Sequence, residues 1–182
     1  MNHVWRYILH PGSCIMNKRG FTLIELLIVV SIIAILAVAL GFSYQGWMGK
    51  YKVESQVKQM YVDLMNARAR AMQMNRMHFF LCITPFTSYN IFDDTNPSPD
   101  GNGTLEVGPD TLLPGYPKSV DYTITWGSGN IQFDSRGYIT ATGTSPWVLS
   151  VSTTNDADYD CISVAETRIL MGKMSGVDCV VK

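Results

Sequence analysis

Charge is scarce in one long stretch of this sequence. Between Phe21 and Leu40, about twenty residues, the only charged residue is Glu25, and nearly all the others are apolar. A helix of that length can cross the roughly 30 Å hydrocarbon core of a bilayer. The segment therefore predicts a membrane-spanning helix.

Histidine is also scarce, which narrows the possible chemistry. Beyond residue 20 the sequence holds one histidine, His78, so a histidine-based triad would have no choice of base. Cys82 follows four residues later, but a zinc site needs further ligands. No catalytic constellation stands out, and we do not expect an enzyme. A membrane-tethered domain with its own activity is the alternative.

Proline is absent from Phe21 to Thr84, and apolar residues keep a helical spacing beyond the span. Val53, Val57, Leu64 and Ala71 recur at steps that place them on one face of a helix. The sequence therefore predicts one helix from Phe21 to about Arg76, with its second half packed on the rest of the chain.

From Met77 to Lys182 the apolar spacing changes to every second residue, which is typical of strands. The clearest segments are Val120 to Trp126 and Trp147 to Val151. Shorter candidates are His78 to Thr84, Ser88 to Phe92, Ile131 to Asp134, Tyr138 to Ala141, Asp160 to Val164, Thr167 to Met171 and Val177 to Val181. We expect an α+β fold in which two small antiparallel sheets pack with the long helix. A loop from Asp93 to Pro117, rich in turn-forming residues, should be exposed.

Charge is divided unevenly along the chain. Residues 43–76 hold six basic and two acidic side chains, a net charge of +4, whereas residues 77–182 hold five basic and twelve acidic ones, a net charge of −7. An acidic surface is a poor match for a phosphate backbone. The composition therefore disfavours nucleic acid as a partner.

Glu25 suggests how the apolar segment is used. An acid near the start of a membrane span costs a few kcal/mol unless a positive charge neutralises it. Cleavage after Gly20 would place a new amino group on Phe21, one helical turn from Glu25. Lys18 and Arg19 would hold the uncut end in the cytoplasm.

Lys18-Arg19-Gly20-Phe21-Thr22-Leu23-Ile24-Glu25-Leu26 resembles the signal of type IV prepilins and type II secretion pseudopilins. The resemblance implies a pilin-like fold, cleavage after Gly20 by a prepilin peptidase and N-methylation of Phe21. It also implies that Glu25 pairs with the amine of a neighbouring subunit in a filament. The implied partners are other pilins, the peptidase/methyltransferase, membrane lipid and an inner-membrane assembly platform.

The same resemblance sets the expected organisation. Residues 1–20 would be a leader, 21–76 the transmembrane and stalk helix, and 77–182 a β-rich head in the periplasm and later in the filament. Met16 is an alternative start, because it leaves the short basic leader Met-Asn-Lys-Arg-Gly. The sequence does not choose between a pilus and a secretion pseudopilus.

A second, weaker resemblance lies in the head. Asn130 to Gly137 and a cysteine-bounded final hairpin resemble minor pilins and pseudopilins of the GspH/FimT kind. Relatives often carry a Gly-Arg pair near the last strands, and some bind DNA with it. Here that place reads Ala165-Glu166-Thr167-Arg168-Ile169, and only Arg168 matches. A DNA-binding tip subunit is therefore the less favoured alternative.

The cysteines and a run of acids complete the candidates. The exported side of a membrane permits disulfides. Cys161 and Cys179 flank the C-terminal segment, and we expect a disulfide between them, whereas Cys82 is expected to be a buried free thiol. Asp156, Asp158 and Asp160 occupy alternate positions, and their carboxylates could supply the hard oxygen ligands that Ca²⁺ prefers. Asp100 to Gly103 is a weaker calcium candidate, and a solvated acidic turn is the default reading of both.

Overall fold

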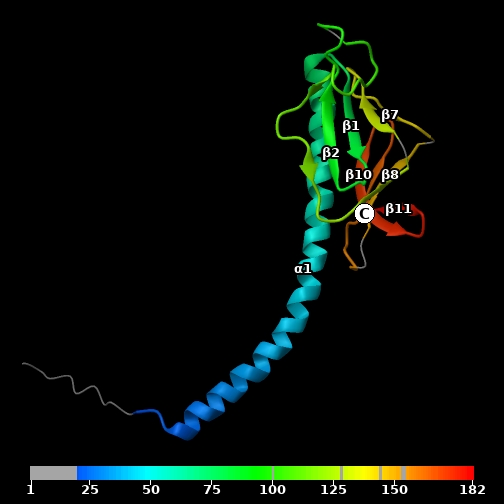
Figure 1. The fold of residues 1–182 in the computed structure, drawn as a ribbon. Coiled ribbons are helices and arrows are strands. Elements are labelled where there is room, and N and C mark those ends of the chain that lie inside the picture. The colour runs from blue at the N-terminus through cyan, green and yellow to red at the C-terminus, as the bar shows by residue number, and fades with distance from the viewer. Residues whose placement is uncertain (1–19, 100, 128, 144, 153–154) are drawn as a thin grey trace, which may run out of the picture. The chain divides into compact units, whose positions relative to one another are not determined.

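The computed structural model describes residues 20–99, 101–127, 129–143, 145–152 and 155–182, and within 39–45 it describes the backbone alone (Figure 1). The predicted leader, apart from Gly20, and the alternative start at Met16 lie outside these residues. The chain divides into two compact units, Met1–Phe42 and Ser43–Lys182. Helix α1, Leu23–Met74, contributes residues to both.

Helix α1 ends with a left-handed residue. Asn75 has a φ of 52°, a conformation that asparagine tolerates better than most residues. The N–H of Arg76 donates to the C=O of Ala71 at 3.2 Å, which closes the last turn as a Schellman motif. The helix therefore ends two residues before the predicted end at Arg76, and strand β1 begins at His78.

The described residues of the second unit form two antiparallel sheets, of six and five strands. One has the order β3-β2-β1-β6-β7, with β4 also paired to β2, and the other has the order β11-β10-β9-β8-β5. The predicted α+β fold is confirmed. The strands are β1 His78–Ile83, β2 Ser88–Asp93, β3 Thr111–Leu112, β4 Lys118–Ser119, β5 Ile124–Trp126, β6 Asn130–Phe133, β7 Ile139–Ala141, β8 Trp147–Val151, β9 Cys161–Val164, β10 Ile169–Ser175 and β11 Asp178–Val181.

The core of the second unit joins the helix to both sheets (Figure 1). The predicted helical stripe is confirmed, since Val53, Val57, Leu64 and Ala71 are all 0% exposed. Strand residues on the inner faces complete the core: Phe80, Ile91, Ile131, Phe133 and Ile139 from one sheet, and Ile124, Leu149, Val151, Ile162 and Val164 from the other. Burying each large side chain contributes about 1.5–3 kcal/mol, so this part of α1 and the sheets stabilise one another.

The predicted strand from Val120 to Trp126 is too long. Strand β5 covers only Ile124–Trp126, because Gln56 of α1 holds the backbone just before it. The side-chain amide of Gln56 donates to the C=O of Tyr122 at 2.7 Å, and its oxygen accepts the N–H of Tyr122 at 2.9 Å. A helix side chain thus supplies the hydrogen bonds that a neighbouring strand would otherwise make.

The prediction of an exposed loop from Asp93 to Pro117 is wrong at three acids. Asp93, Asp94 and Asp110 are 8%, 1% and 4% exposed. The segment also contains β3, Thr111–Leu112, which pairs with β2. Asp94 and Asp110 can be buried because their carboxylates accept backbone N–H groups of the loop, whereas Asp93 pairs with the Arg76 side chain.

Candidate functional site

The segment Gly20 to Glu25 combines an exposed peptide bond with a capped helix start. Gly20 and Phe21 precede α1, and the Phe21 side chain is 83% exposed. Thr22 caps the helix, because its hydroxyl oxygen accepts the N–H of Glu25 at 3.2 Å. Thr22 and Glu25 have the spacing of a capping box. The Gly20–Phe21 bond therefore lies outside the helix, where a peptidase can reach it.

Glu25 is an exposed acid in the first turn of α1. A negative charge is favourable there because the N-terminal end of a helix carries partial positive charge. Among the residues that the structure describes, its carboxylate accepts no hydrogen bond and forms no ion pair. A positive group from outside this set of residues would find the carboxylate available.

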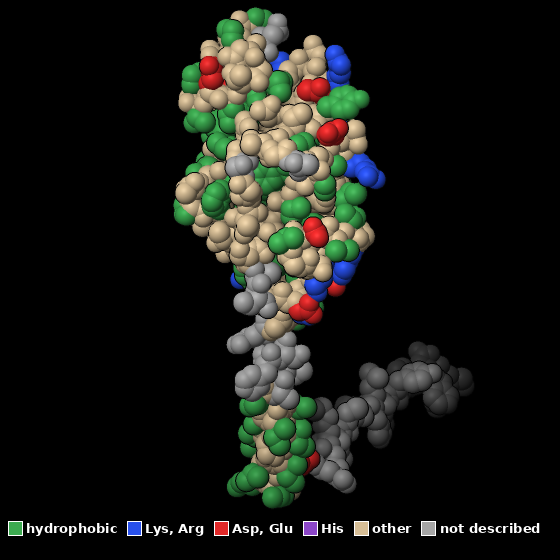
Figure 2. All heavy atoms as spheres, turned by 90° about the vertical axis from the view of Figure 1, so that its right-hand side faces the viewer, with side chains coloured by type: hydrophobic (Ala, Val, Ile, Leu, Met, Phe, Trp, Pro, Cys, Tyr) green, Lys and Arg blue, Asp and Glu red, His purple; other side chains and the backbone are tan. Residues whose placement is uncertain are grey.

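The helix that follows Glu25 is apolar and exposed around its whole circumference. Leu23, Val29 and Ile35 are 83%, 48% and 70% exposed, and Figure 2 shows apolar side chains over the visible face of this segment. A helix that is hydrophobic all round is normally covered by a membrane or by other protein. Within the described residues, no helix combines the length and the apolarity needed to span a membrane. The predicted span from Phe21 reaches Leu40, whose side chain lies outside those described.

The N-terminal sequence matches a known processing signal. The prokaryotic N-terminal methylation motif matches residues 15–41. The chain carries the prepilin signal of the type IV pilin and pseudopilin superfamily. No curated protein and no solved structure is significantly similar to the chain as a whole. The prepilin signal thus covers the exposed Gly20–Phe21 bond, Glu25 and the start of the apolar helix.

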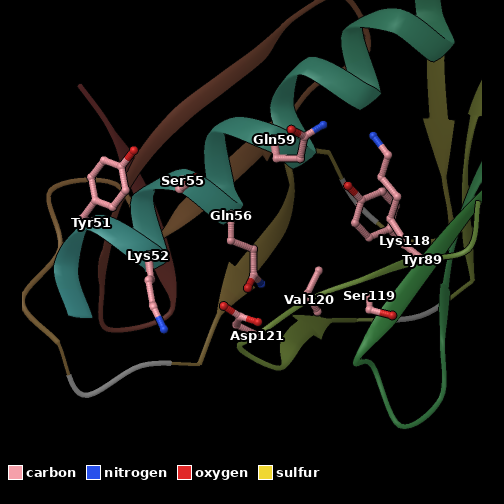
Figure 3. Close-up of a pocket in the computed structure, with 10 residues that line it drawn as sticks. All are labelled: Tyr51, Lys52, Ser55, Gln56, Gln59, Tyr89, Lys118, Ser119, Val120 and Asp121. Atoms are coloured by element: carbon pink, nitrogen blue, oxygen red, sulfur yellow. The ribbon is translucent and has the colours of Figure 1, made fainter. Parts of the chain in front are cut away.

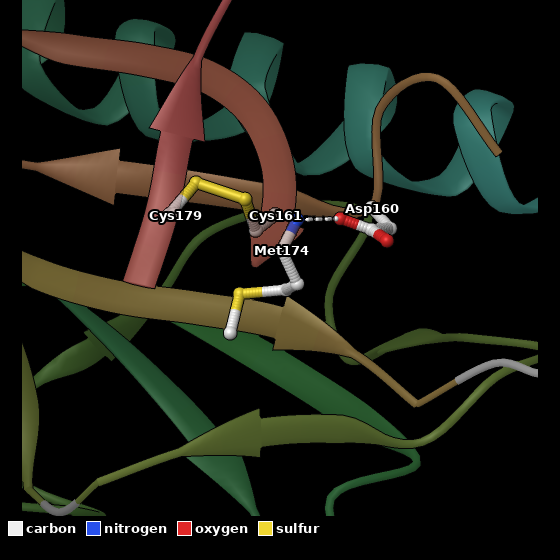
Figure 4. The surroundings of a disulfide bond; sticks show 4 residues. All are labelled: Asp160, Cys161, Met174 and Cys179. Carbon is white, nitrogen blue, oxygen red and sulfur yellow. Dashed lines mark hydrogen bonds between the residues drawn. A yellow bond between two sulfur atoms is a disulfide. The ribbon is translucent and has the colours of Figure 1, made fainter. Parts of the chain in front are cut away.

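The helix followed by antiparallel sheets is consistent with a pilin-like fold, as the prepilin signal implies. In the second unit, the structure joins Cys161 of β9 to Cys179 of β11 in a disulfide, with 6.0 Å between their Cα atoms (Figure 4). Gly172 of β10, which pairs with both strands, lies beneath it. A Cβ on Gly172 would clash with the Val180 carbonyl oxygen and would lie 3.0 Å from the Cys179 sulfur. Glycine there leaves room for the disulfide.

The three acids predicted as calcium ligands point to different partners. Asp156 pairs with Lys173 and Lys50, and Asp158 pairs with Lys182 at 2.9 Å. These hydrogen bonds from lysine lower the pKa of both carboxyls. Asp160 accepts the backbone N–H of Met174 at 2.6 Å (Figure 4). Within the described residues, no group of three acidic, histidine or cysteine side chains is placed to hold a metal ion; Asp100 of the other candidate lies outside them.

Arg68 of α1 and Arg76, just beyond the end of the helix, both bind groups of the head. Arg68 donates to the C=O of Thr167 at 2.9 Å. Arg76 donates to the carboxylate of Asp93 at 2.8 Å and to the C=O of Pro99 at 2.9 Å. Arg168, the remaining basic residue of the weaker resemblance, lies exposed in the turn between β9 and β10. Of these arginines, Arg76 thus pairs with an acid of the head, and Arg68 binds its backbone.

Sequence reasoning missed a buried acid on the helix. Asp63 is 3% exposed, and its carboxylate accepts the hydroxyl of Tyr89 at 2.6 Å and the ammonium of Lys118 at 2.7 Å. Gln59 donates to the same carboxylate at 3.2 Å. Burial raises the pKa of Tyr89, and the bond to Asp63 raises it further, so Tyr89 is a donor here. No local pattern marks Asp63, because Tyr89 and Lys118 are distant in sequence.

A cavity of about 380 Å³ lies beside this cluster, between α1 and the segment after β4 (Figure 3). Its walls include Tyr51, Gln59 and Lys52 from the helix and Lys118 and Asp121 from the opposite side. None of the lining residues is a histidine or a cysteine, and Lys118 is already paired with Asp63. The cavity therefore lacks a nucleophile paired with a base.

His78 and Cys82 are both buried in β1, as expected for a helix-to-strand junction and a free thiol. Burial raises the pKa of Cys82 to about 12, so the thiol stays protonated. Burial lowers the pKa of His78, while the nearby Asp93 carboxylate opposes that shift. The pair thus offers neither a thiolate nor an exposed base.

Proposed function

We propose that this protein is a minor pilin or pseudopilin, a structural subunit of a type IV pilus or of a type II secretion pseudopilus. One observation carries the proposal: the prepilin signal coincides with an accessible Gly20–Phe21 bond at the start of a capped helix. The second unit, with its two sheets, would then be the exported head. Its described part holds no catalytic constellation, which suits a structural role.

In this proposal the peptidase cuts after Gly20 and methylates the new amine of Phe21. The apolar segment then anchors the subunit in the bacterial inner membrane, with the second unit in the periplasm. During assembly, Glu25 of one subunit accepts the positive amine of its neighbour. The pairing stabilises the filament because an unpaired acid in apolar surroundings costs a few kcal/mol. The exposed apolar side chains of α1 supply the surface that lipid and neighbouring helices cover.

Replacing Gly20 tests the cleavage step. Gly20→Val should leave uncut precursor, because the side chain would occupy the place where the peptidase binds glycine. A Cβ at Gly20 meets nothing within 4 Å among the described residues, so the variant should fold normally. Mass spectrometry of the membrane fraction reads the N-terminal peptide, with Gly46→Ala as a glycine control. A mature N-terminus at Phe21 in the Gly20 variant, or elsewhere in the wild type, would contradict the proposal.

Replacing Glu25 tests the assembly step separately. Glu25→Ala and Glu25→Gln should be inserted and cut after Gly20, yet enter filaments about tenfold less often or worse, because a lost charge pair of at least about 1.4 kcal/mol lowers incorporation by that factor. The amount in sheared filaments relative to the membrane pool measures this. Equal incorporation of Glu25→Gln and wild type would exclude the pairing role.

A further inference from the structure

One three-residue motif of the second unit has no part in the assembly mechanism. Asn102-Gly103-Thr104 has the pattern Asn-x-Ser/Thr, with x other than proline, which is the acceptor of N-linked glycans. Asn96 also has a hydroxyl residue two positions later, but Pro97 stands between them. Asn96 therefore fails the pattern within the same loop, and the remaining asparagines lack a hydroxyl residue at that position.

The structure presents the Asn102 side chain to solvent. Asn102 and Thr104 are both exposed. The carboxamide oxygen of Asn102 accepts the Thr104 hydroxyl at 2.6 Å and the Thr104 N–H at 2.9 Å. Among the described residues, the Asn102 carboxamide nitrogen donates no hydrogen bond. The oxygen therefore faces its own chain, and the nitrogen is left accessible.

A buried acid fixes the backbone beneath the motif. Asp94, 1% exposed, accepts the N–H of Asn102 at 3.1 Å and that of Gly103 at 2.7 Å. Gly103 has a φ of +79°, a left-handed conformation that favours glycine at the middle position. Proline there would lack the N–H that binds Asp94. The motif is thus held as a fixed turn and not as a loose tail.

The turn lies at the end of the second unit where α1 terminates (Figure 1). The Arg76 side chain, just beyond the helix, donates to the C=O of Pro99 at 2.9 Å. This places the loop beside the C-terminal end of α1, while Gly20 and Phe21 precede its N-terminal end. A large polar substituent on Asn102 would extend into solvent without displacing any described contact.

We propose that Asn102 is a site of N-linked glycosylation. The donor would be a sugar joined through its anomeric carbon to a lipid diphosphate, and the catalyst a membrane glycosyltransferase. The Asn102 nitrogen forms a bond to the anomeric carbon and loses one proton. The bond from that carbon to the phosphate oxygen breaks, and its electron pair leaves with the lipid diphosphate. The inference rests on the proposed function only because the second unit must reach the exported side.

The test uses the full-length protein purified from the cells that produce it. Trypsin releases residues 77–118 as one peptide, which contains both Asn102 and Asn96. We expect that peptide to carry a glycan mass localised to Asn102 by fragmentation. Asn102→Gln and Thr104→Val should lose the added mass completely, whereas Thr104→Ser, which keeps a hydroxyl group, should retain it. Asn66→Gln, an exposed asparagine outside any such motif, is the matched control.

The N-terminal peptide in the same spectrum separates the two proposals. An unmodified 77–118 peptide from a protein that begins at Phe21 overturns the glycosylation and leaves the filament role intact. A glycan on Asn102 of an uncut precursor would support the glycosylation and overturn the filament role. A glycan on Asn96, or one that persists in Thr104→Val, also overturns the assignment to this motif.

Discussion

Two of the acids of helix α1, Glu25 and Asp63, lie in opposite surroundings. Glu25 is exposed in the first unit, and its carboxylate has no partner among the described residues. Asp63 is buried in the second unit, where Tyr89, Lys118 and Gln59 donate to it. Asp63 completes the fold of its own chain. Among the described residues, the Glu25 carboxylate has no such role, which agrees with the intermolecular pairing proposed above.

The apolar residues of the two units differ in the same way. Side chains from Leu23 to Val38 are exposed, whereas Val57 and Leu64 further along α1 are 0% exposed. One helix therefore has a part that the chain leaves uncovered and a part that it covers with two sheets. Stability of the second unit and assembly through the first should respond to different substitutions.

The largest expected effect on folding comes from Asp63→Ala. It leaves the Tyr89 hydroxyl and the Lys118 ammonium without their acceptor, so the free energy of unfolding should fall by about 3 kcal/mol. Lys118 is 32% exposed and can turn to water, which keeps the loss at the lower end of the range for buried pairs. Urea denaturation of the mature protein in detergent measures it.

Two further variants should destabilise the second unit less than Asp63→Ala does. Asp63→Asn keeps an acceptor for Tyr89 and should cost less, about 1–2 kcal/mol. Glu25→Ala should change the unfolding of the second unit by no more than about 0.5 kcal/mol. If Glu25→Ala destabilises the second unit as much as Asp63→Ala, the contrast between the two acids is wrong.

Much of this fold could be predicted from local sequence patterns. Strand β8 has the predicted bounds, Trp147 to Val151, because alternation of apolar and polar residues reflects one buried face. The errors arose where groups distant in the sequence determine the local structure. Gln56 binds the backbone of Tyr122, so the strand begins only at Ile124, and loop N–H groups satisfy the buried Asp94. Periodicity reports only which face is apolar, so it cannot reveal such polar contacts.

The candidate site shows the same difference between contiguous motifs and contacts between residues distant in the sequence. Gly20, Phe21 and Glu25 could be predicted because the prepilin signal is a contiguous motif that a peptidase reads in sequence. The cluster of Asp63, Tyr89 and Lys118 could not, because it joins three separate elements. Sequence thus located the prepilin signal of the first unit and the outline of the second.

Removing the disulfide should also destabilise the second unit without affecting the first, and by somewhat less than Asp63→Ala. Cys161 and Cys179 are 18 residues apart, and closing a loop of that size contributes roughly 3 kcal/mol at most in the chain-entropy model. Cys179→Ser should therefore lower the free energy of unfolding by about 2–3 kcal/mol, measured by urea denaturation. Cys82→Ser is the control for the loss of a sulfur atom.

The same disulfide variant should not alter maturation. In the proposed maturation, the peptidase recognises only the first unit, so the N-terminus of Cys179→Ser should be Phe21, as proposed for the wild type. Accumulation of uncut precursor would show that the second unit must be folded before the peptidase acts. That result would mean that maturation of the first unit depends on folding of the second.

The smallest expected effect is the pH dependence that His78 gives to the second unit. His78 is 1% exposed, and its Nε2 lies 3.8 Å from the Asp93 carboxylate. Burial lowers its pKa below the model-compound value of 6.5, against the opposing effect of Asp93. Because the folded chain binds this proton more weakly than the unfolded chain, the stabilisation is present above pH 6.5 and is lost as the pH falls towards the folded pKa.

Urea denaturation between about pH 7.5 and about pH 5 isolates this effect, because carboxyl groups stay largely ionised over that range. The mature chain from Phe21 contains no other histidine. Wild type should lose stability on acidification by less than either substitution above, and His78→Gln should flatten the profile. Equal slopes in the two proteins would mean that His78 gains or loses its proton as easily in the fold as in the unfolded chain. The Asp93 carboxylate would then offset the cost of burying the charged ring, and His78 would not contribute a pH dependence to the second unit.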